Sequence, residues 1–410
     1  MTDAQPSTAA VPARYGRVVP ACLGVVLVAC ACAATEGWFD RHFLPSFFLP
    51  RRTYLVILTV VRLTMAALGL WLTCVVAFRQ RRGSTRRRGR ILSVVIAGLL
   101  ALGASEVSLR FIHLRPGEWL LPEEEPRRQV DPRLGWTFVP SRVGRASVGG
   151  RSIEYAVDAA GYRVRSVAEA IDPDRPTILC IGESVMFGEG LTWDETVPAQ
   201  IGSMTGIQTA NLAVHGYSTD QGYLRLQTEL PRFHHPVAVV SLFMTALFGR
   251  NLDDDRPHLG PGLVWHPAQT HARLLSLAKL LVPYRRDETV ARGVAVTQEV
   301  LRSSAELSRA RGATPLILVP QLGPEEAGEQ AVRRRVLDDG ALPYVLVQID
   351  EAWRLPWDRH PNAYAAHVIA AAVVARLQKT IATSGAAGAI GQAHHSPPHD
   401  GETDVQRVFH

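Results

Sequence analysis

The segment Thr177-Ile-Leu-Cys-Ile-Gly-Glu-Ser184-Val-Met-Phe-Gly-Glu-Gly190 decides the fold that this chain is predicted to adopt. Its first five residues are apolar or β-branched, and Gly182 follows them directly. A short apolar run that ends at a glycine is typical of a buried strand in a parallel sheet. Ser184 would then lie at the carboxyl end of that strand, where open α/β sheets bind their ligands. Taken alone, the segment also fits an ordinary strand-to-loop turn.

Short apolar runs alternate with helical stretches from residue 175 onward. The predicted strands are 177–181, 207–212, 237–243, 314–319 and 344–349, and the predicted helices are 196–204, 221–230, 288–311, 325–338 and 363–381. This alternation predicts an α/β domain over residues 175–383, with a parallel sheet and helices on both faces. Residues 114–174 are predicted to form a linker and a small β-hairpin element, and residues 384–410 a disordered tail.

Three apolar runs precede this domain, at about residues 18–34, 54–78 and 91–112. Each run approaches or exceeds the roughly 20 residues that a helix needs to cross the hydrocarbon core of a membrane. We therefore predict a membrane region over residues 1–113 with about three transmembrane helices. The first run also fits a signal peptide, but the two runs that follow favour an uncleaved helix.

The positive charge of the chain is concentrated between the second and third runs. Seven arginines lie between residues 79 and 90, and the formal net charge of the whole chain is +6. Without this cluster the chain is close to neutral, which argues against nucleic-acid binding. Positively charged loops stay in the cytoplasm, so everything after about residue 113 is predicted to lie outside the cytoplasmic membrane. Arg62 and Glu106, within the second and third runs, are explained more simply by snorkelling or mutual pairing than by a transport pathway.

Metal-binding patterns are weak in this sequence. The five cysteines lack C-x-x-C spacing and fall in apolar runs, which is typical of small core side chains. The loop from Asp253-Asp-Asp-Arg-Pro-His258 to Trp265-His266 offers carboxylate and imidazole ligands. Its place over the predicted site favours a lid or a substrate-lining loop instead. We predict neither a metal nor a cofactor.

Three further segments carry polar side chains at predicted strand ends or directly before the last helix. They are Asn211-Leu-Ala-Val-His-Gly216, Phe248-Gly-Arg-Asn251-Leu-Asp-Asp-Asp255 and Leu355-Pro-Trp-Asp358-Arg-His360-Pro-Asn362. The carboxyl ends of parallel strands meet at one edge of a sheet, so we expect these segments beside Ser184. A serine needs an adjacent base, a histidine takes a proton near neutral pH, and a carboxylate holds the imidazole in the useful tautomer.

Together the four segments resemble the SGNH (GDSL-like) hydrolase superfamily, in the order in which that family carries them. The resemblance covers most of residues 175–380 and implies a three-layer α/β/α, flavodoxin-like fold. It implies Ser184 as the nucleophile, His360 as the base and Asp358 as the carboxylate that orients the base. It also implies an oxyanion hole formed by Ser184, Gly216 and Asn251, whose N–H groups would stabilise the charge of a tetrahedral intermediate.

Three positions depart from the family pattern. Glu183 stands where the family has aspartate, and we expect this change to be harmless because that side chain need not touch the reacting atoms. Asn251 is followed by leucine instead of aspartate, and Asp358 lies one residue closer to His360 than in the commonest form. Plainer interpretations are a solvated turn for Asn251 and a helix N-cap for Asp358.

The predicted function is that of a membrane-anchored, extracytoplasmic serine esterase or O-acyltransferase acting on acyl esters. The serine would form an acyl-enzyme and pass the acyl group to water or to a sugar hydroxyl. Predicted location and family analogy indicate acylated cell-envelope glycans or lipids as substrates. The alternative is a non-catalytic envelope scaffold, or a partner of a membrane acyl-transfer system. The oligomeric state is left open.

Overall fold

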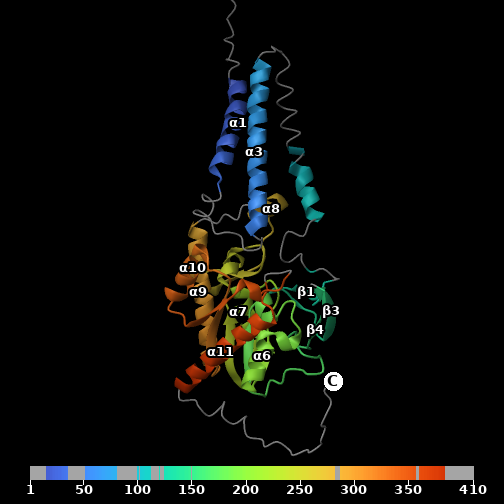
Figure 1. Cartoon of the computed structure of the whole chain (residues 1–410), viewed down its shortest axis with the longest axis vertical. Helices are drawn as coiled ribbons and strands as arrows, with labels where there is room; N and C mark the ends of the chain where they lie inside the picture. The colour runs from blue at the N-terminus through green and yellow to red at the C-terminus, as the bar shows by residue number, and fades with distance from the viewer. Residues whose placement is uncertain are drawn as a thin grey trace, which may run out of the picture. The chain divides into compact units, whose positions relative to one another are not determined.

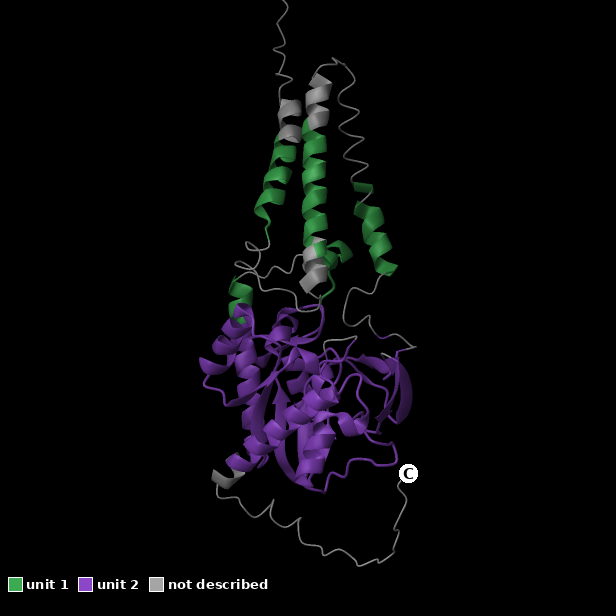
Figure 2. Ribbon diagram, viewed as in Figure 1, with its two compact units in different colours: residues 1–119, 269–292 green, residues 120–268, 293–410 purple. Residues whose placement is uncertain are grey.

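The computed structural model of the 410-residue chain describes residues 15–35, 51–80, 99–100, 102–111, 120, 124–148, 150–281, 287–356 and 360–383. The chain forms two compact units (Figure 2): unit 1 holds residues 1–119 and 269–292, and unit 2 holds residues 120–268 and 293–410. The tail predicted over residues 384–410 lies outside the described residues.

Unit 1 is helical in the part of it that the structure describes. Its named elements are α1 (Tyr15–Ala33), α3 (Arg51–Gln80), η1 (Leu109–Phe111) and α8 (Arg273–Leu281). Helix α1 packs along α3 (Figure 1), and a Cβ atom placed on Gly24 would lie 2.7 Å from the Gly69 carbonyl oxygen. The two glycines therefore permit the close approach of the helices.

The two charged side chains noted in the apolar runs of unit 1 bind backbone groups. Arg62 Nε donates to the Ala31 carbonyl oxygen at 2.9 Å. Glu106 accepts the backbone N–H groups of Arg273 and Leu274, at 2.7 and 2.9 Å, at the start of α8. Each side chain thus fastens a neighbouring helix in the described structure.

The structure does not support the three transmembrane helices predicted from the sequence. Among the described residues, no helix combines the length and the apolar character that crossing a membrane requires. The third predicted span, residues 91–112, lies partly outside the described residues, as does most of the arginine-rich segment 79–90.

Unit 2 is built on a mixed sheet of eight strands in the order β12-β11-β8-β6-β7-β5-β4-β3. Its parallel strands are β6 (Thr177–Ile181), β7 (Gln208–Asn211), β8 (Pro236–Leu242), β11 (Thr314–Leu322) and β12 (Tyr344–Ile349). Numbered along the chain, these five have the order 2-1-3-4-5 of flavodoxin-like sheets. The predicted α/β class and central parallel sheet are confirmed.

Strand β6 lies at the centre of this sheet, and all five of its residues are buried. Ile178 and Cys180 face the layer that contains α6 and α11, while Leu179 and Ile181 face the layer that contains α7. Because side chains alternate along a strand, a run that is apolar throughout needs cover on both faces. The continuous apolar run of β6 therefore gives the three-layer arrangement.

The helices and short elements that lie in unit 2, wholly or for most of their length, complete these layers. They are α5 (Ser184–Phe187), η3 (Trp193–Glu195), α6 (Val197–Thr205), α7 (Thr219–Glu229), η4 (Leu230–Arg232), η5 (Thr245–Leu252), η6 (Pro261–Leu263), α9 (Asp287–Ala310), α10 (Ala327–Arg333), η7 (Arg334–Asp338), η8 (Glu351–Trp353) and α11 (Ala363–Thr383). Two short strands, β9 (His258–Leu259) and β10 (Trp265–His266), pair with each other in the loop after η5.

The segment predicted as a linker and separate hairpin instead extends the main sheet. Strands β3 (Arg142–Val148), β4 (Arg151–Val157) and β5 (Arg163–Val164) are antiparallel, and β5 joins β7 through Arg163 opposite Asn211. Strands β1 (Arg128–Asp131) and β2 (Gly135–Phe138) form a hairpin of their own. Residues 120–174 therefore belong to unit 2, and β5 pairs with β7, the neighbour of the strand that leads to Ser184.

Candidate active site

Ser184 is the first residue of α5 and follows the central strand directly. Gly182 forms the exit from β6, where an added Cβ atom would lie 2.6 Å from Leu242 Cβ of β8. Only glycine fits there, because that distance is far below a van der Waals contact. Strand β6 lies between β7 and β8, so Ser184 stands at the point where the strand order reverses. Ligands of open α/β sheets bind at this point.

The structure brings His360 to Ser184. His360 Nε2 lies 2.7 Å from Ser184 Oγ, although the two residues are 176 positions apart in the sequence. The His360 carbonyl oxygen accepts the Leu355 N–H at 2.8 Å, a bond between the two described residues Leu355 and His360. Serine and histidine are thus placed as a nucleophile and a base must be.

Asp358, predicted as the carboxylate that orients the base, lies outside the described residues, and its role stays a prediction. The helix N-cap suggested as its alternative role is filled by another side chain. Asn362 Oδ1 accepts the Ala365 N–H at 3.0 Å at the start of α11. That bond satisfies one of the free N–H groups of the first turn.

Glu183 contacts the reacting oxygen, contrary to the expectation from the sequence. Its Oε2 accepts the Ser184 N–H at 2.8 Å and lies 2.5 Å from Ser184 Oγ. Its Oε1 accepts the Val185 N–H at 3.1 Å, so the carboxylate also caps α5. The expectation was wrong because the glutamate side chain folds back over the serine that follows it.

Arg250 of η5 forms an ion pair with this carboxylate. Arg250 Nη1 lies 3.2 Å from Glu183 Oε2, and both side chains are buried. Burial opposes the ionisation of Glu183, but Arg250, His360 and the bond from Ser184 together hold its pKa below the ordinary value. Glu183 is therefore an anion at neutral pH, next to both the nucleophile and the base.

Gly216 lies in the left-handed region, with φ 75°, and the peptide groups on both sides of it are fixed. Trp136 Nε1 donates to the His215 carbonyl oxygen at 2.9 Å, and Arg256 Nη1 donates to the Gly216 carbonyl oxygen at 2.6 Å. In a trans peptide the C=O and N–H groups point in opposite directions. The bond from Trp136 therefore directs the Gly216 N–H away from the indole ring, and this peptide is rigidly oriented.

The structure does not turn Asn251 toward the nucleophile. Asn251 Oδ1 accepts the Thr219 N–H, and Nδ2 donates to the hydroxyls of Thr219 and Thr297, all at 3.0 Å. A primary amide has two N–H hydrogens, and both are used in these bonds. Asn251 thus fastens η5 to α7 and α9, and Arg250 is the residue of this segment that reaches the group around Ser184.

Arg163, which is not among the site residues predicted from the sequence, organises the loop after α5. Its Nη1 donates to the carbonyl oxygens of Phe187 and Gly188, both at 2.7 Å, and Nη2 donates to that of Leu191 at 2.5 Å. The guanidinium carbon lies 4.6 Å from the centre of the Phe187 ring. Burial lowers the pKa of Arg163 to about 10, so it stays charged at neutral pH. No sequence signal indicates this role, because it depends on the pairing of β5 with β7.

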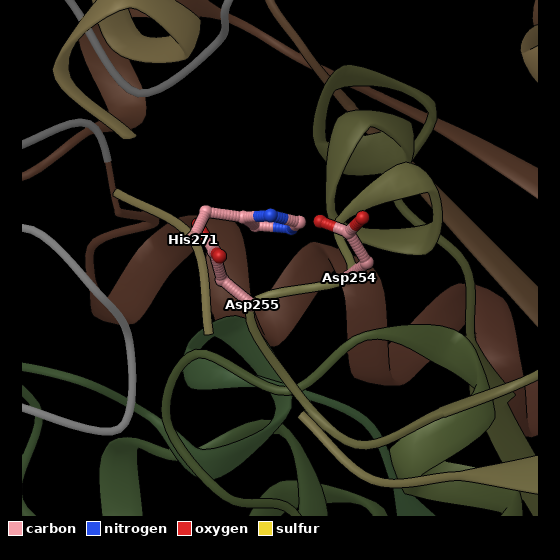
Figure 3. A group of neighbouring side chains, drawn as sticks. All are labelled: Asp254, Asp255 and His271. Carbon is pink, nitrogen blue, oxygen red and sulfur yellow. The ribbon is translucent and has the colours of Figure 1, made fainter. Parts of the chain in front are cut away.

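The loop after η5 carries the carboxylates that the sequence offered as metal ligands. Figure 3 shows Asp254 and Asp255, which belong to unit 2, and His271, which belongs to unit 1. Within unit 2 only the two adjacent carboxylates remain, and two carboxylates alone do not make a metal site. The predicted lid or substrate-lining role of this loop stays a prediction.

No family model and no curated protein sequence matches this chain. Solved structures resemble part of it. A protein described as a lipolytic member of the G-D-S-L family from Desulfitobacterium hafniense is 12% identical, with TM-score 0.32, over 49% of this chain and 98% of its own. A protein described as an arylesterase from Agrobacterium tumefaciens is 15% identical, with TM-score 0.33, over 50% of this chain and 99% of its own. An acetyl xylan esterase from the rumen bacterium Butyrivibrio proteoclasticus is 12% identical, with TM-score 0.34, over 52% of this chain and 66% of its own.

Proposed function

We propose that this chain is a serine esterase of the SGNH type, with Ser184 as the nucleophile and His360 as the general base. One observation carries the proposal, namely the 2.7 Å distance between His360 Nε2 and Ser184 Oγ. A base at hydrogen-bond distance takes the hydroxyl proton while the oxygen attacks an acyl carbon. A non-catalytic scaffold has no need of this contact.

The reaction follows from the positions of these groups. Ser184 Oγ forms a bond to the acyl carbon, its proton moves to His360 Nε2, and the carbonyl electron pair moves onto the carbonyl oxygen. His360 then gives the proton to the leaving alkoxide as the ester C–O bond breaks, which leaves an acyl-enzyme. Water, deprotonated by His360, attacks that acyl-enzyme and regenerates the serine.

Backbone N–H groups would stabilise the oxyanion of the intermediate. The Gly216 N–H belongs to a peptide fixed by Trp136 and Arg256. The Ser184 N–H donates to Glu183 in the structure, and it becomes a second donor when the substrate oxygen displaces that carboxylate oxygen. Donors that are fixed before the charge develops need no reorganisation during the reaction.

Transfer of the acyl group to a hydroxyl is the second outcome that the same acyl-enzyme allows. A sugar hydroxyl that reaches the acyl carbon before water converts the hydrolase into an O-acyltransferase. We propose acylated cell-envelope glycans or lipids as the substrates, supported by the location predicted from the sequence. Asp358, in the same loop as His360, is proposed to orient the imidazole.

We also propose that unit 1 anchors the chain at the cytoplasmic membrane, with the catalytic unit outside the cell interior. The proposal is supported by the apolar runs and the arginine cluster of the sequence. Apolar side chains of α1 and α3 that are more than half exposed, such as Leu23, Val26, Leu63 and Trp71, favour an apolar environment. A phosphatase reporter fused after residue 115 is expected to be active. Activity of a cytoplasm-dependent reporter at the same position would contradict this orientation.

Labelling with a fluorophosphonate tests the proposed nucleophile. The serine oxygen displaces fluoride and forms a stable phosphonate ester, which a fluorescent tag reports. The full chain and a Ser203→Ala control are expected to label, since Ser203 is an exposed residue of α6. Ser184→Ala is expected not to label. Equal labelling of Ser184→Ala and the unmodified chain would rule out Ser184 as the nucleophile.

A further inference from the structure

Two side chains contact the nucleophilic oxygen, whereas a serine–histidine pair requires only one. Ser184 Oγ lies 2.7 Å from His360 Nε2 and 2.5 Å from Glu183 Oε2. The hydroxyl has one hydrogen and can donate it to one of the two groups at a time. If it donates to Glu183, then His360 Nε2 must carry a hydrogen of its own and donate to Ser184. The reaction requires the other arrangement, in which the hydroxyl donates to His360 Nε2, and the negative charge of Glu183 beside the imidazole then favours transfer of that proton to His360.

The length of the glutamate side chain explains the contact. An N-cap needs only an oxygen that reaches the free N–H groups of the first turn, and aspartate suffices for that. At Glu183 the extra methylene lets one carboxylate hold the N–H groups of Ser184 and Val185 and still touch Ser184 Oγ. The contact with Oγ is therefore a property beyond helix capping.

Arg250 holds the carboxylate in this position. Its Nη1 lies between Glu183 Oε2, at 3.2 Å, and the Tyr217 carbonyl oxygen, at 3.3 Å. The pair is buried, so its charges are weakly screened by water. When the substrate oxygen takes over the Ser184 N–H, Glu183 keeps Arg250 as its partner and remains beside His360.

We propose that Glu183 is a catalytic residue of this enzyme: its carboxylate, held by Arg250, stabilises the imidazolium that His360 becomes on taking the Ser184 proton. The proposal rests on the esterase function proposed above. Imidazole and carboxylate both touch the same oxygen, so they lie within the few ångströms over which opposite charges interact strongly. The proton moves from Ser184 Oγ to His360 Nε2, and Glu183 neither gains nor loses one.

Other charged and titratable groups lie on the strands and loops around this cluster. They are Tyr155 of β4, Arg163 of β5, Glu189 and His215 of the flanking loops, and Arg256 after η5. None of them changes in the variants below, so a change in the pH profile reports on Glu183 or Arg250. Asp358 is likewise kept.

The experiment is the pH profile of kcat/KM for a chromogenic acetate ester with the full chain. Activity falls at low pH when His360 is protonated before it can act as a base. Glu183→Gln removes a negative charge beside His360, so the acid limb is expected to move about one pH unit lower. The turnover rate is expected to fall roughly tenfold. Glu326→Gln is the matched control, because Glu326 caps α10, and it is expected to leave the profile unchanged.

Arg250→Gln gives the opposite change and keeps the proposal testable if Glu183→Gln does not fold. It removes a positive charge near His360, so the acid limb is expected to move to higher pH. If Glu183 and Arg250 had only a structural role, both variants would lose activity, but the acid limb of the pH profile would not move in opposite directions. The proposal would be overturned if the acid limb of the kcat/KM profile stayed at the same pH in Glu183→Gln. It would also be overturned if the acid limb stayed at the same pH, or moved to lower pH, in Arg250→Gln. If the fluorophosphonate did not label Ser184 of the unmodified chain, the esterase function itself would be overturned instead.

Discussion

Replacement of Asn251 by alanine separates the role that this structure gives the residue from the role that family resemblance implies. In the structure, Asn251 makes three hydrogen bonds to Thr219 and Thr297. Each such bond contributes about 1 kcal/mol net, so Asn251→Ala is expected to lower the free energy of unfolding by roughly 2–3 kcal/mol. For a domain of this size, that corresponds to a fall in Tm of roughly 5–10 °C.

The effect of Asn251→Ala on catalysis is expected to be small. Loss of an oxyanion donor costs about 3 kcal/mol in the barrier, which slows turnover roughly 100- to 1,000-fold. Asn251 uses both amide hydrogens elsewhere, so we expect turnover of a chromogenic acetate ester to slow less than about tenfold. The assay combines kcat for that ester, measured well below Tm, with thermal unfolding followed by circular dichroism.

Thr297→Val is the matched control for Asn251→Ala, because it removes one partner of the same amide from α9. It is expected to lower Tm by a smaller amount and to leave kcat nearly unchanged. If Asn251→Ala instead slowed turnover by about 100-fold or more while Tm stayed unchanged, the assignment of Asn251 as a structural residue would be refuted.

Three further predictions concern the groups that hold the site. Trp136→Phe removes the donor to His215, so kcat is expected to fall roughly tenfold with little change in KM, and unchanged steady-state kinetics would contradict this. Arg163→Met leaves three carbonyl oxygens without their donor and is expected to cost about 3 kcal/mol or more in urea unfolding, whereas an unchanged midpoint would argue against it. The pKa of Glu183 is held below its ordinary value of 4.5, so ionised Glu183 stabilises the fold above that pH and this contribution is lost as the pH falls below it. In this acidic range, the free energy of unfolding is expected to depend less steeply on pH in Glu183→Gln than in the unmodified chain. Parallel curves of the free energy of unfolding against pH would count against the buried ion pair.

The elements of the parallel core could be predicted because their signals are local. The apolar run 177–181 needs cover on both faces, and the alternation with helices fixes the class of the sheet. Each predicted strand and helix of the domain is present, with ends that differ from the structure by only a few residues. The proximity of His360 to Ser184 also followed from the sequence, because both flank elements that meet at one sheet edge.

The direction of individual side chains could not be predicted, because it depends on distant partners. The amide of Asn251 is not directed at the serine because it bonds Thr219 and Thr297, which belong to two other helices. Glu183 reaches Ser184 Oγ because its side chain is one methylene longer than that of aspartate and pairs with Arg250, and no sequence pattern encodes that pair.

The placement of the early strands was missed for a similar reason. The sequence of residues 135–162 predicts a hairpin, but the attachment of β3, β4 and β5 to the parallel strands is a single pairing, Arg163 opposite Asn211. The apolar runs of unit 1 led to a further prediction, of membrane-spanning helices, which the described residues do not support.

Location of the covalent adduct tests the central claim most directly. After reaction with a fluorophosphonate, the full chain is digested and the modified peptide is sequenced by mass spectrometry. We expect the adduct on Ser184, and we expect His360→Ala to form it at least about 100-fold more slowly, because the base lies 2.7 Å from Ser184 Oγ. An adduct on another serine, or formation at the unmodified rate in His360→Ala, would contradict the account.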